Sequence, residues 1–145
     1  MSLKLLRKNY GTRKDLEQQG VWVKPIIDEE SDIAFLLARM FRTNRKWAGR
    51  ISKVYRQHKR KIDTGAMPDE QANKISLNIF CESVLLDWRG ITTDEGKAIP
   101  YTPEEGIKLL NELPDLYDYL KAEAEEAATY QDEVAESTAE KSASI

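Results

Sequence analysis

The amino-acid sequence predicts a mainly α fold: a small single-domain helical protein with a short N-terminal β element and a flexible acidic C-terminal tail. Apolar residues recur at helical spacing along residues 45–61. Signals that end and restart helices are concentrated in residues 82–116. The chain has 145 residues, of which 41% are hydrophobic, enough to bury one modest core. We divide it into an N-terminal arm (1–19), a helical domain (20–130) and a disordered acidic tail or linker (131–145).

The N-terminal third carries the expected β element. Residues 1–19 are polar and weakly patterned, so a short helix and an ordered arm both stay open for them. Residues 21–27 have strand character, and Pro25 places them at a sheet edge or a bend. Residues 33–40 form a continuous apolar run, which periodicity alone assigns either to a strand or to the start of a helix.

Two long helices are predicted next. The first has one apolar stripe, formed by Trp47, Ile51, Val54, Tyr55 and His58, with cations on its other faces. The second begins at Pro68, which two acids follow. We extend it to about Trp88, because apolar residues continue on two of its faces. A helix that is apolar on two faces is usually the central one, and Trp88 is expected in the core.

A turn and two shorter helices complete the prediction. Gly90 follows the apolar run, where a helix C-terminus favours glycine, and residues 94–97 form a polar turn. Thr102 and Pro103 then begin a helix, and Glu105 completes a capping box. We expect helices over 103–113 and from 115 to about 130, before the composition becomes typical of disorder.

Charge is distributed unevenly along the chain. The net charge is only −3, yet residues 39–61 contain ten cations and no acid. From Glu112 onward there are ten acids and two lysines. The molecule is therefore expected to carry a basic and an acidic region. No run is long and apolar enough to predict a membrane span or a signal peptide, so we expect a cytoplasmic protein without membrane partners.

No group of residues predicts chemistry. Cys81 lies in an apolar helical pattern, which raises a thiol pKa and blocks access, and its lone thiol fits a reducing cytosol. His58 lacks the further nitrogen or sulfur ligands that a metal site needs. Turn formation and helix N-terminal charge account for the paired carboxylates, and phosphate-binding glycine loops are absent from the sequence. We therefore expect no enzyme, no catalytic residue, no cofactor and no metal.

The order of residues between 85 and 114 resembles a known family. The residues that carry the resemblance are Leu85, Leu86, Asp87, Trp88, Gly90, Ile91, Gly96, Lys97, Ile99, Pro100, Tyr101, Thr102, Glu105, Leu109, Leu110 and Pro114. They resemble the tail assembly chaperones of long-tailed (siphovirus-type) bacteriophages. Upstream segments, including Asn44 and the basic helix, follow the family's usual order, so the resemblance covers roughly residues 16–128.

The resemblance implies a fold detail and a function. It favours a strand over residues 33–40 that pairs with residues 21–27. It implies a protein that binds the phage tape measure protein, keeps it soluble and helps recruit tail tube (major tail) subunits, in the host bacterial cytoplasm. Such a chaperone is absent from the mature virion. Members are often also made as a longer frameshifted product, and the acidic tail would suit a linker to such an extension. Self-association stays open.

The basic helix offers an alternative function. Residues 42–61 could serve a small nucleic-acid-binding regulator, because closely spaced cations can follow a phosphate backbone. We rank nucleic acid well below a protein partner, since the interleaved Trp47 and Tyr55 fall on the apolar stripe and are expected in the core. The acidic C-terminal third would also compete for the same cations. The candidate partner-binding residues are Arg42, Arg45, Lys46, Arg50 and Lys53.

Overall fold

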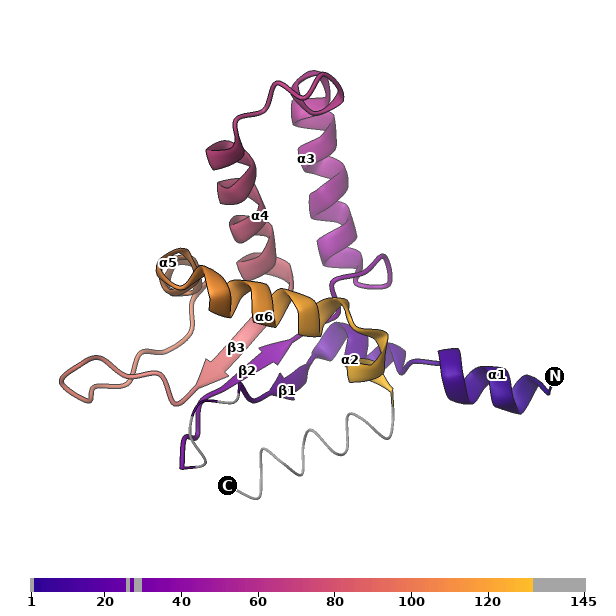
Figure 1. Ribbon diagram of the computed structural model, residues 1–145, viewed down its shortest axis with the longest axis horizontal. Helices are drawn as coiled ribbons and strands as arrows, with labels where there is room; N and C mark the ends of the chain where they lie inside the picture. Colours follow the sequence, from indigo (N-terminus) through magenta and orange to yellow (C-terminus); the bar gives the residue numbers. More distant parts are fainter. Residues whose placement is uncertain (1, 26, 28–29, 132–145) are drawn as a thin grey trace.

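The computed structural model describes residues 2–25, 27 and 30–131, so all but Gln131 of the expected tail lies outside the described residues. The structure is mainly α with one small sheet, as predicted (Figure 1). In chain order its elements are α1 (Leu3–Tyr10), α2 (Lys14–Gln19), β1 (Val21–Val23), β2 (Ala34–Leu37), α3 (Arg45–Asp63), α4 (Asp69–Ser83), β3 (Leu85–Arg89), α5 (Pro103–Glu112), α6 (Pro114–Glu125) and the 3-10 turn η1 (Ala127–Tyr130).

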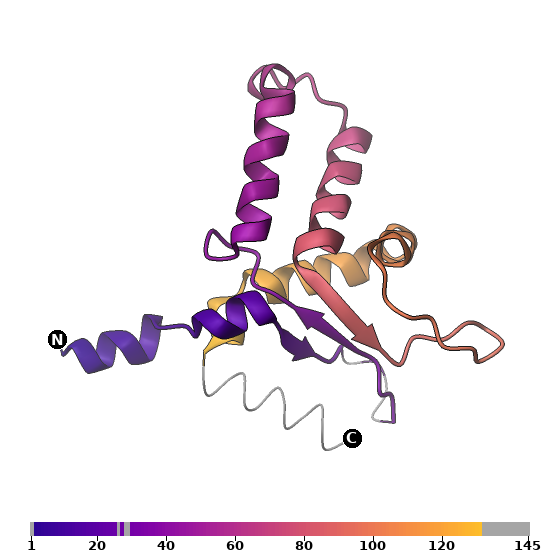
Figure 2. The ribbon, with the colours of Figure 1, turned by 180° about the vertical axis from the view of Figure 1, so that it is seen from behind.

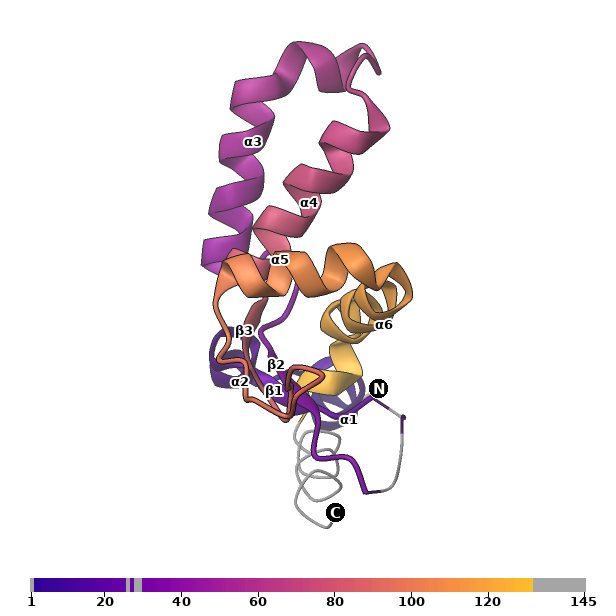
Figure 3. The same ribbon diagram turned by 90° about the vertical axis from the view of Figure 1, so that its left-hand side faces the viewer.

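The sheet is antiparallel, with β2 between β1 and β3. The predicted pairing of the first two strands is confirmed: Val21 lies opposite Leu37, and Val23 opposite Phe35. Helix α6 crosses one face of the sheet (Figures 1 and 2). Helices α3 and α4 rise side by side from the same end of the sheet, away from the rest of the molecule (Figures 1 and 3).

The predicted extension of α4 to Trp88 is wrong. The helix ends at Ser83, and Leu85–Arg89 is a strand that pairs with β2. Ser83 Oγ donates to Ile79 O at 2.5 Å, a local bond of the kind that competes with the helical ladder. A run that is apolar on both faces suits a helix and a buried strand equally, and the open edge of β2 selects the strand.

Gly90 consequently follows a strand, not a helix. Its φ of +79° is a conformation that glycine adopts without strain. A Cβ at this position would lie 2.8 Å from Asp32 Oδ1 and 2.9 Å from Ile33 N. Gly90 therefore lets the chain leave β3 in close contact with the segment that leads into β2.

The predicted turn and the predicted Thr102 cap are confirmed. Thr93 N donates to Lys97 O at 2.8 Å, which closes the predicted turn. Thr102 Oγ1 accepts from Glu105 N at 3.2 Å and caps α5, while the Glu105 carboxylate pairs with Lys108 at 3.7 Å. The last predicted helix is divided, because α6 ends at Glu125 and η1 follows it. The N-terminal arm contains two short helices, α1 and α2.

The core lies between the sheet and helices α4, α5 and α6. Trp88 is buried there, with 6% of its surface exposed, as the sequence predicts. Its ring meets Tyr101 edge-on at a centroid distance of 5.0 Å and Phe35 at 6.4 Å. Its Nε1 donates to Ile99 O at 2.7 Å, so both the apolar body and the polar tip of the indole are satisfied.

We expect Trp88→Ala to lower the free energy of unfolding by about 3–5 kcal/mol, because the substitution leaves a cavity beside Phe35, Ile99 and Tyr101. Chemical denaturation measures the change. Trp22→Ala is the matched control: Trp22 is half-buried beneath the Arg89 guanidinium and should cost less. An equal loss in the two variants would contradict the core role of Trp88.

Candidate interaction surface

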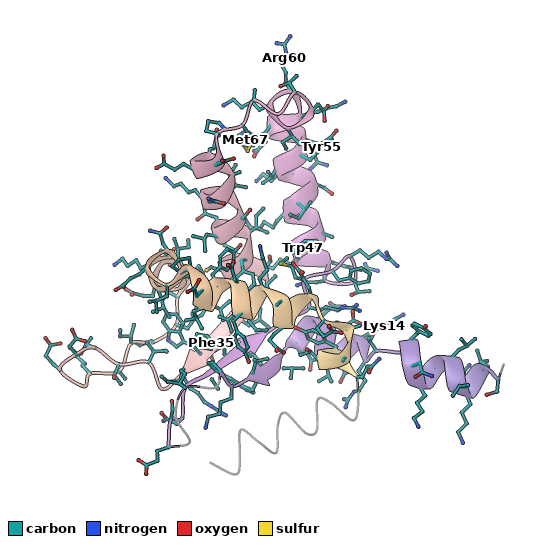
Figure 4. All side chains as sticks on the ribbon, in the orientation of Figure 1. Lys14, Phe35, Trp47, Tyr55, Arg60 and Met67 are labelled. Atoms are coloured by element: carbon teal, nitrogen blue, oxygen red, sulfur yellow. The ribbon has the colours of Figure 1, made fainter. Side chains whose placement is uncertain are left out.

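The candidate interaction surface is on the helical arm, by which we mean residues 45–83: α3, α4 and the loop between them. Helix α3 has no buried residue along its 19 positions. Figure 4 shows Trp47 at the base of the arm, and Arg60 and Met67 at its tip. Helix α3, which spans Arg45–Asp63, was predicted from the sequence.

The apolar stripe of α3 is only partly covered. Ile51 and Tyr55 are each 42% exposed, and Ile62 is 40% exposed. The expected core position of Tyr55 is therefore wrong. Its hydroxyl donates to Asp63 Oδ1 at 3.0 Å, an end-of-arm contact within α3 itself. The stripe is open because α4 packs closely against α3 only towards the base of the arm, where the two helices meet the sheet (Figure 3).

All five predicted partner-binding residues are exposed, but the structure divides them. Lys46, Arg50 and Lys53 recur at helical spacing and share a face that is turned away from the apolar stripe. Arg50 Nη1 lies 2.5 Å from Glu82 Oε2, which joins α3 to α4. Arg45 lies in the first turn of α3. Arg42 precedes the helix, and its guanidinium stands over the Phe41 ring at 4.5 Å.

A groove of about 130 Å³ lies at the base of the arm. Its lining comes from α3, α4, α6 and the segment before α3: Met40, Trp47, Ile51, Ser76, Ile79, Phe80, Tyr117 and Lys121. The Lys121 ammonium stands over the Tyr117 ring at 5.3 Å, so a cation lies beside an apolar floor. This groove could not be predicted from the sequence, because its walls come from segments as far apart as Met40 and Lys121.

Asn44 attaches the arm to the rest of the fold. Its side-chain oxygen accepts from Trp47 N at 3.2 Å and caps α3. Its Nδ2 donates to Arg39 O at 3.0 Å and to Ser83 O at 2.8 Å. One buried amide therefore holds the start of α3 against the end of α4.

A buried ion pair lies beside this attachment. Glu17 in α2 is 1% exposed, and its Oε2 accepts from Arg39 Nη1 at 2.9 Å and from the Thr43 hydroxyl. Its Oε1 accepts from Thr12 Oγ1 at 2.7 Å. Burial by itself would raise the pKa of the Glu17 carboxyl, but the three hydrogen bonds and the charge of Arg39 outweigh burial and lower that pKa. The carboxylate is thus held ionised in the interior.

The two residues considered for chemistry, Cys81 and His58, both lie in helices. Cys81 is buried, and desolvation, with a smaller contribution from Glu82, raises the pKa of its thiol to about 12. His58 is half-buried at a break in the helical geometry of α3. Among residues 2–25, 27 and 30–131, histidine, cysteine and carboxylate side chains do not gather in threes that could hold a metal ion. Over the same residues, the helices lack the length and apolar character needed to cross a membrane.

The buried ion pair makes a pH-dependent contribution to stability. We expect Glu17→Gln to destabilise the fold by about 3–5 kcal/mol at neutral pH, because it leaves the Arg39 charge buried without a counter-charge. The pKa of Glu17 is lowered in the folded state, so its contribution is fully present above the unfolded value of 4.5 and is lost as the pH falls through the lower, folded value.

Denaturant unfolding of both proteins over a pH series measures this. The difference in unfolding free energy should be constant near neutral pH and should shrink below pH 4.5. Asp15→Asn serves as the control, because that carboxylate pairs with Arg13 at the surface. A difference that stays constant to low pH would show that the charge of Glu17 is not what stabilises the fold.

Comparison with known proteins places the chain in a family. The family model described as YdaY prophage protein matches residues 43–141, which begin at the base of the arm and include β3, α5 and α6. Comparisons with curated proteins and with solved structures found no match. The matched range covers about two thirds of the 145 residues. It follows that the chain is prophage-derived and belongs to the YdaY prophage protein family.

Proposed function

We propose that this protein is a tail assembly chaperone, the class that its residues 85–114 resemble. It would bind the tape measure protein, keep it soluble and help recruit tail tube subunits, in the host bacterial cytoplasm and without becoming part of the virion. The observation that carries the proposal is the helical arm: α3 presents the apolar residues Ile51, Tyr55 and Ile62 to the surroundings and buries none of its side chains. The prophage family match agrees with a phage role.

The arm suits a helical client. An amphipathic client helix laid along α3 would remove the exposed apolar stripe from water, at about 25 cal/mol for each Å² covered. The groove at the base of the arm would accept one apolar side chain of that helix between Trp47 and Tyr117. This is the way in which a chaperone covers the apolar surface of its client until assembly.

The cations would add selectivity for acidic segments of the client. Lys46 and Lys53 are exposed on the α3 face that is turned away from the stripe, whereas Arg50 on the same face is paired with Glu82. Exposed charges of this kind contribute little to affinity but speed encounter with an oppositely charged partner. The proposed role is therefore a binding role, in which the apolar stripe and the cationic face of α3 both take part in recognition.

One observation favours the alternative of nucleic-acid binding. Tyr55 is exposed, so an aromatic ring on α3 is accessible for stacking on a base. Against this, Trp47 lines the groove at the base of the arm, which leaves Tyr55 as the exposed aromatic ring of α3. A surface that follows a single strand stacks successive bases on several rings, so one exposed ring on α3 favours the protein client.

Charge reversal on the arm tests the proposal. We expect Lys46→Glu with Lys53→Glu to weaken binding to the tape measure protein about tenfold, because two attractive charges become repulsive. The matched control is Lys97→Glu with Lys108→Glu, two exposed lysines outside the arm that should leave binding unchanged. Affinity is measured by a pull-down titration with the tape measure protein, together with its soluble yield on co-expression.

The same variants are titrated against duplex and single-stranded DNA at two salt concentrations. A protein client predicts weak binding to DNA for all three proteins. Tight DNA binding that falls steeply with salt, with a slope of about −0.9 per phosphate contacted, and no capture of the tape measure protein would overturn the proposal in favour of the regulator.

A further inference from the structure

Helix α1 is an amphipathic helix that the rest of the described chain leaves uncovered. None of its eight residues is buried, and Leu3, Leu6 and Tyr10 are 59%, 41% and 82% exposed. These three residues recur at helical spacing and so share one side of the helix. Ser2 Oγ accepts from Leu5 N at 3.2 Å, so the helix is capped and formed even though nothing covers it.

The fold also contains an unfilled groove between α4 and α5. Its volume is about 520 Å³, and its lining residues are Glu70, Asn73, Lys74, Leu77, Ile107 and Asn111. Leu77 and Ile107 supply an apolar floor between polar walls. A groove of this size accommodates several aliphatic side chains, which is what one side of a short amphipathic helix offers.

The charges of α1 and of the groove are complementary. Helix α1 carries Lys4, Arg7 and Lys8 and no acid. Helices α4 and α5, which form the groove, each carry three acids and one lysine, a combined charge of −4: Asp69, Glu70 and Glu82 with Lys74 in α4, and Glu104, Glu105 and Glu112 with Lys108 in α5. The basic α3 would repel α1, whereas the net negative charge of the α4 and α5 side chains attracts it.

Distance excludes this contact within one molecule. Figure 1 places α1 at one end of the molecule and α5 at the opposite end, with the sheet between them. Gln131 Nε2 donates to Asn9 O at 3.2 Å. This bond attaches the C-terminal end of α1 to the residue that follows η1, on the side of the molecule away from α5. An α1 that fills an α4–α5 groove must therefore come from another copy.

We propose that α1 of one copy binds the α4–α5 groove of a second copy, so that copies associate head to tail. Leu3 and Leu6 enter the groove over Leu77 and Ile107, and the cations of α1 lie against Glu70 at its rim. Such an interface is heterologous: each copy has one helix to give and one groove to fill. Association therefore continues beyond a dimer unless a ring closes.

A two-variant complementation experiment tests this. The helix variant is Leu3→Ser with Leu6→Ser, which changes residues that the fold does not bury. The groove variant is Glu70→Lys with Asn111→Lys, which places two cations at exposed groove positions. Ile27→Ser is the control, because it also replaces an exposed aliphatic side chain with serine but lies outside α1 and the groove. Thermal unfolding confirms that all variants keep the fold.

Sedimentation velocity of the full chain reads out the result. The parent and Ile27→Ser should exceed the monomer mass of 16.6 kDa as concentration rises, and less so at high salt. Each of the two variants by itself should stay monomeric. Mixed together, they should give a complex of twice the monomer mass and no larger, because only one intact helix and one intact groove remain. A parent chain that is monomeric throughout, or variants that associate like the parent, would overturn the proposal.

Discussion

The side-chain amide of Asn44 is the contact on which the arrangement of this fold depends. Its oxygen caps α3, and its nitrogen donates to the carbonyl groups of Arg39 and Ser83. Three segments, two of which are 39 residues apart at Asn44 and Ser83, therefore meet at one buried group. Aspartate would lack the two donors, and an apolar residue would leave both carbonyl oxygens without a partner in the interior. The direction in which the arm leaves the sheet follows from this junction.

The surrounding contacts reinforce the same place in the chain. The backbone after β2 is held from several sides: Ala38 N donates to Val84 O, Arg39 N to Glu17 O and Met40 N to Ala124 O, each at 2.8 Å. The Tyr130 hydroxyl donates to Leu37 O at 3.0 Å. Helices from both ends of the chain thus converge on the residues that lead from the sheet into the arm. The base of the arm is held by hydrogen bonds, and the apolar residues towards its tip are exposed. A binding surface needs both a fixed position and exposed contact residues.

The sequence predicted the elements that local signals define and missed those that distant partners define. Helix α3, the Thr102 cap and the turn closed by Thr93 and Lys97 depend on nearby residues, and all three were predicted. Strand β3 was read as helix, because an apolar run has no preference until a neighbouring strand edge is present. Glu17 gave no signal at all. It is a polar residue in a polar segment, and its burial depends on Arg39, which lies 22 residues away.

The candidate site was predicted in the same uneven way. The cations of α3 are exposed, as their spacing on an amphipathic helix predicts. Periodicity placed Tyr55 on the apolar stripe correctly but could not say whether another helix would cover it. Both grooves escaped prediction, because their walls come from helices that meet only in the folded state.

The position of β2 in the middle of the sheet has a consequence for the family to which this chain belongs. The matched range begins at residue 43, after β2, yet β3 lies within it and finds its only described strand neighbour in β2. The matched segment is therefore not a folding unit by itself. Cut free at residue 43, it would present β3 as an open edge and lose the buried Arg39 together with its Glu17 partner. In this chain, the matched segment is a helical arm and its supports, and β1 and β2, which precede the matched range, complete its sheet.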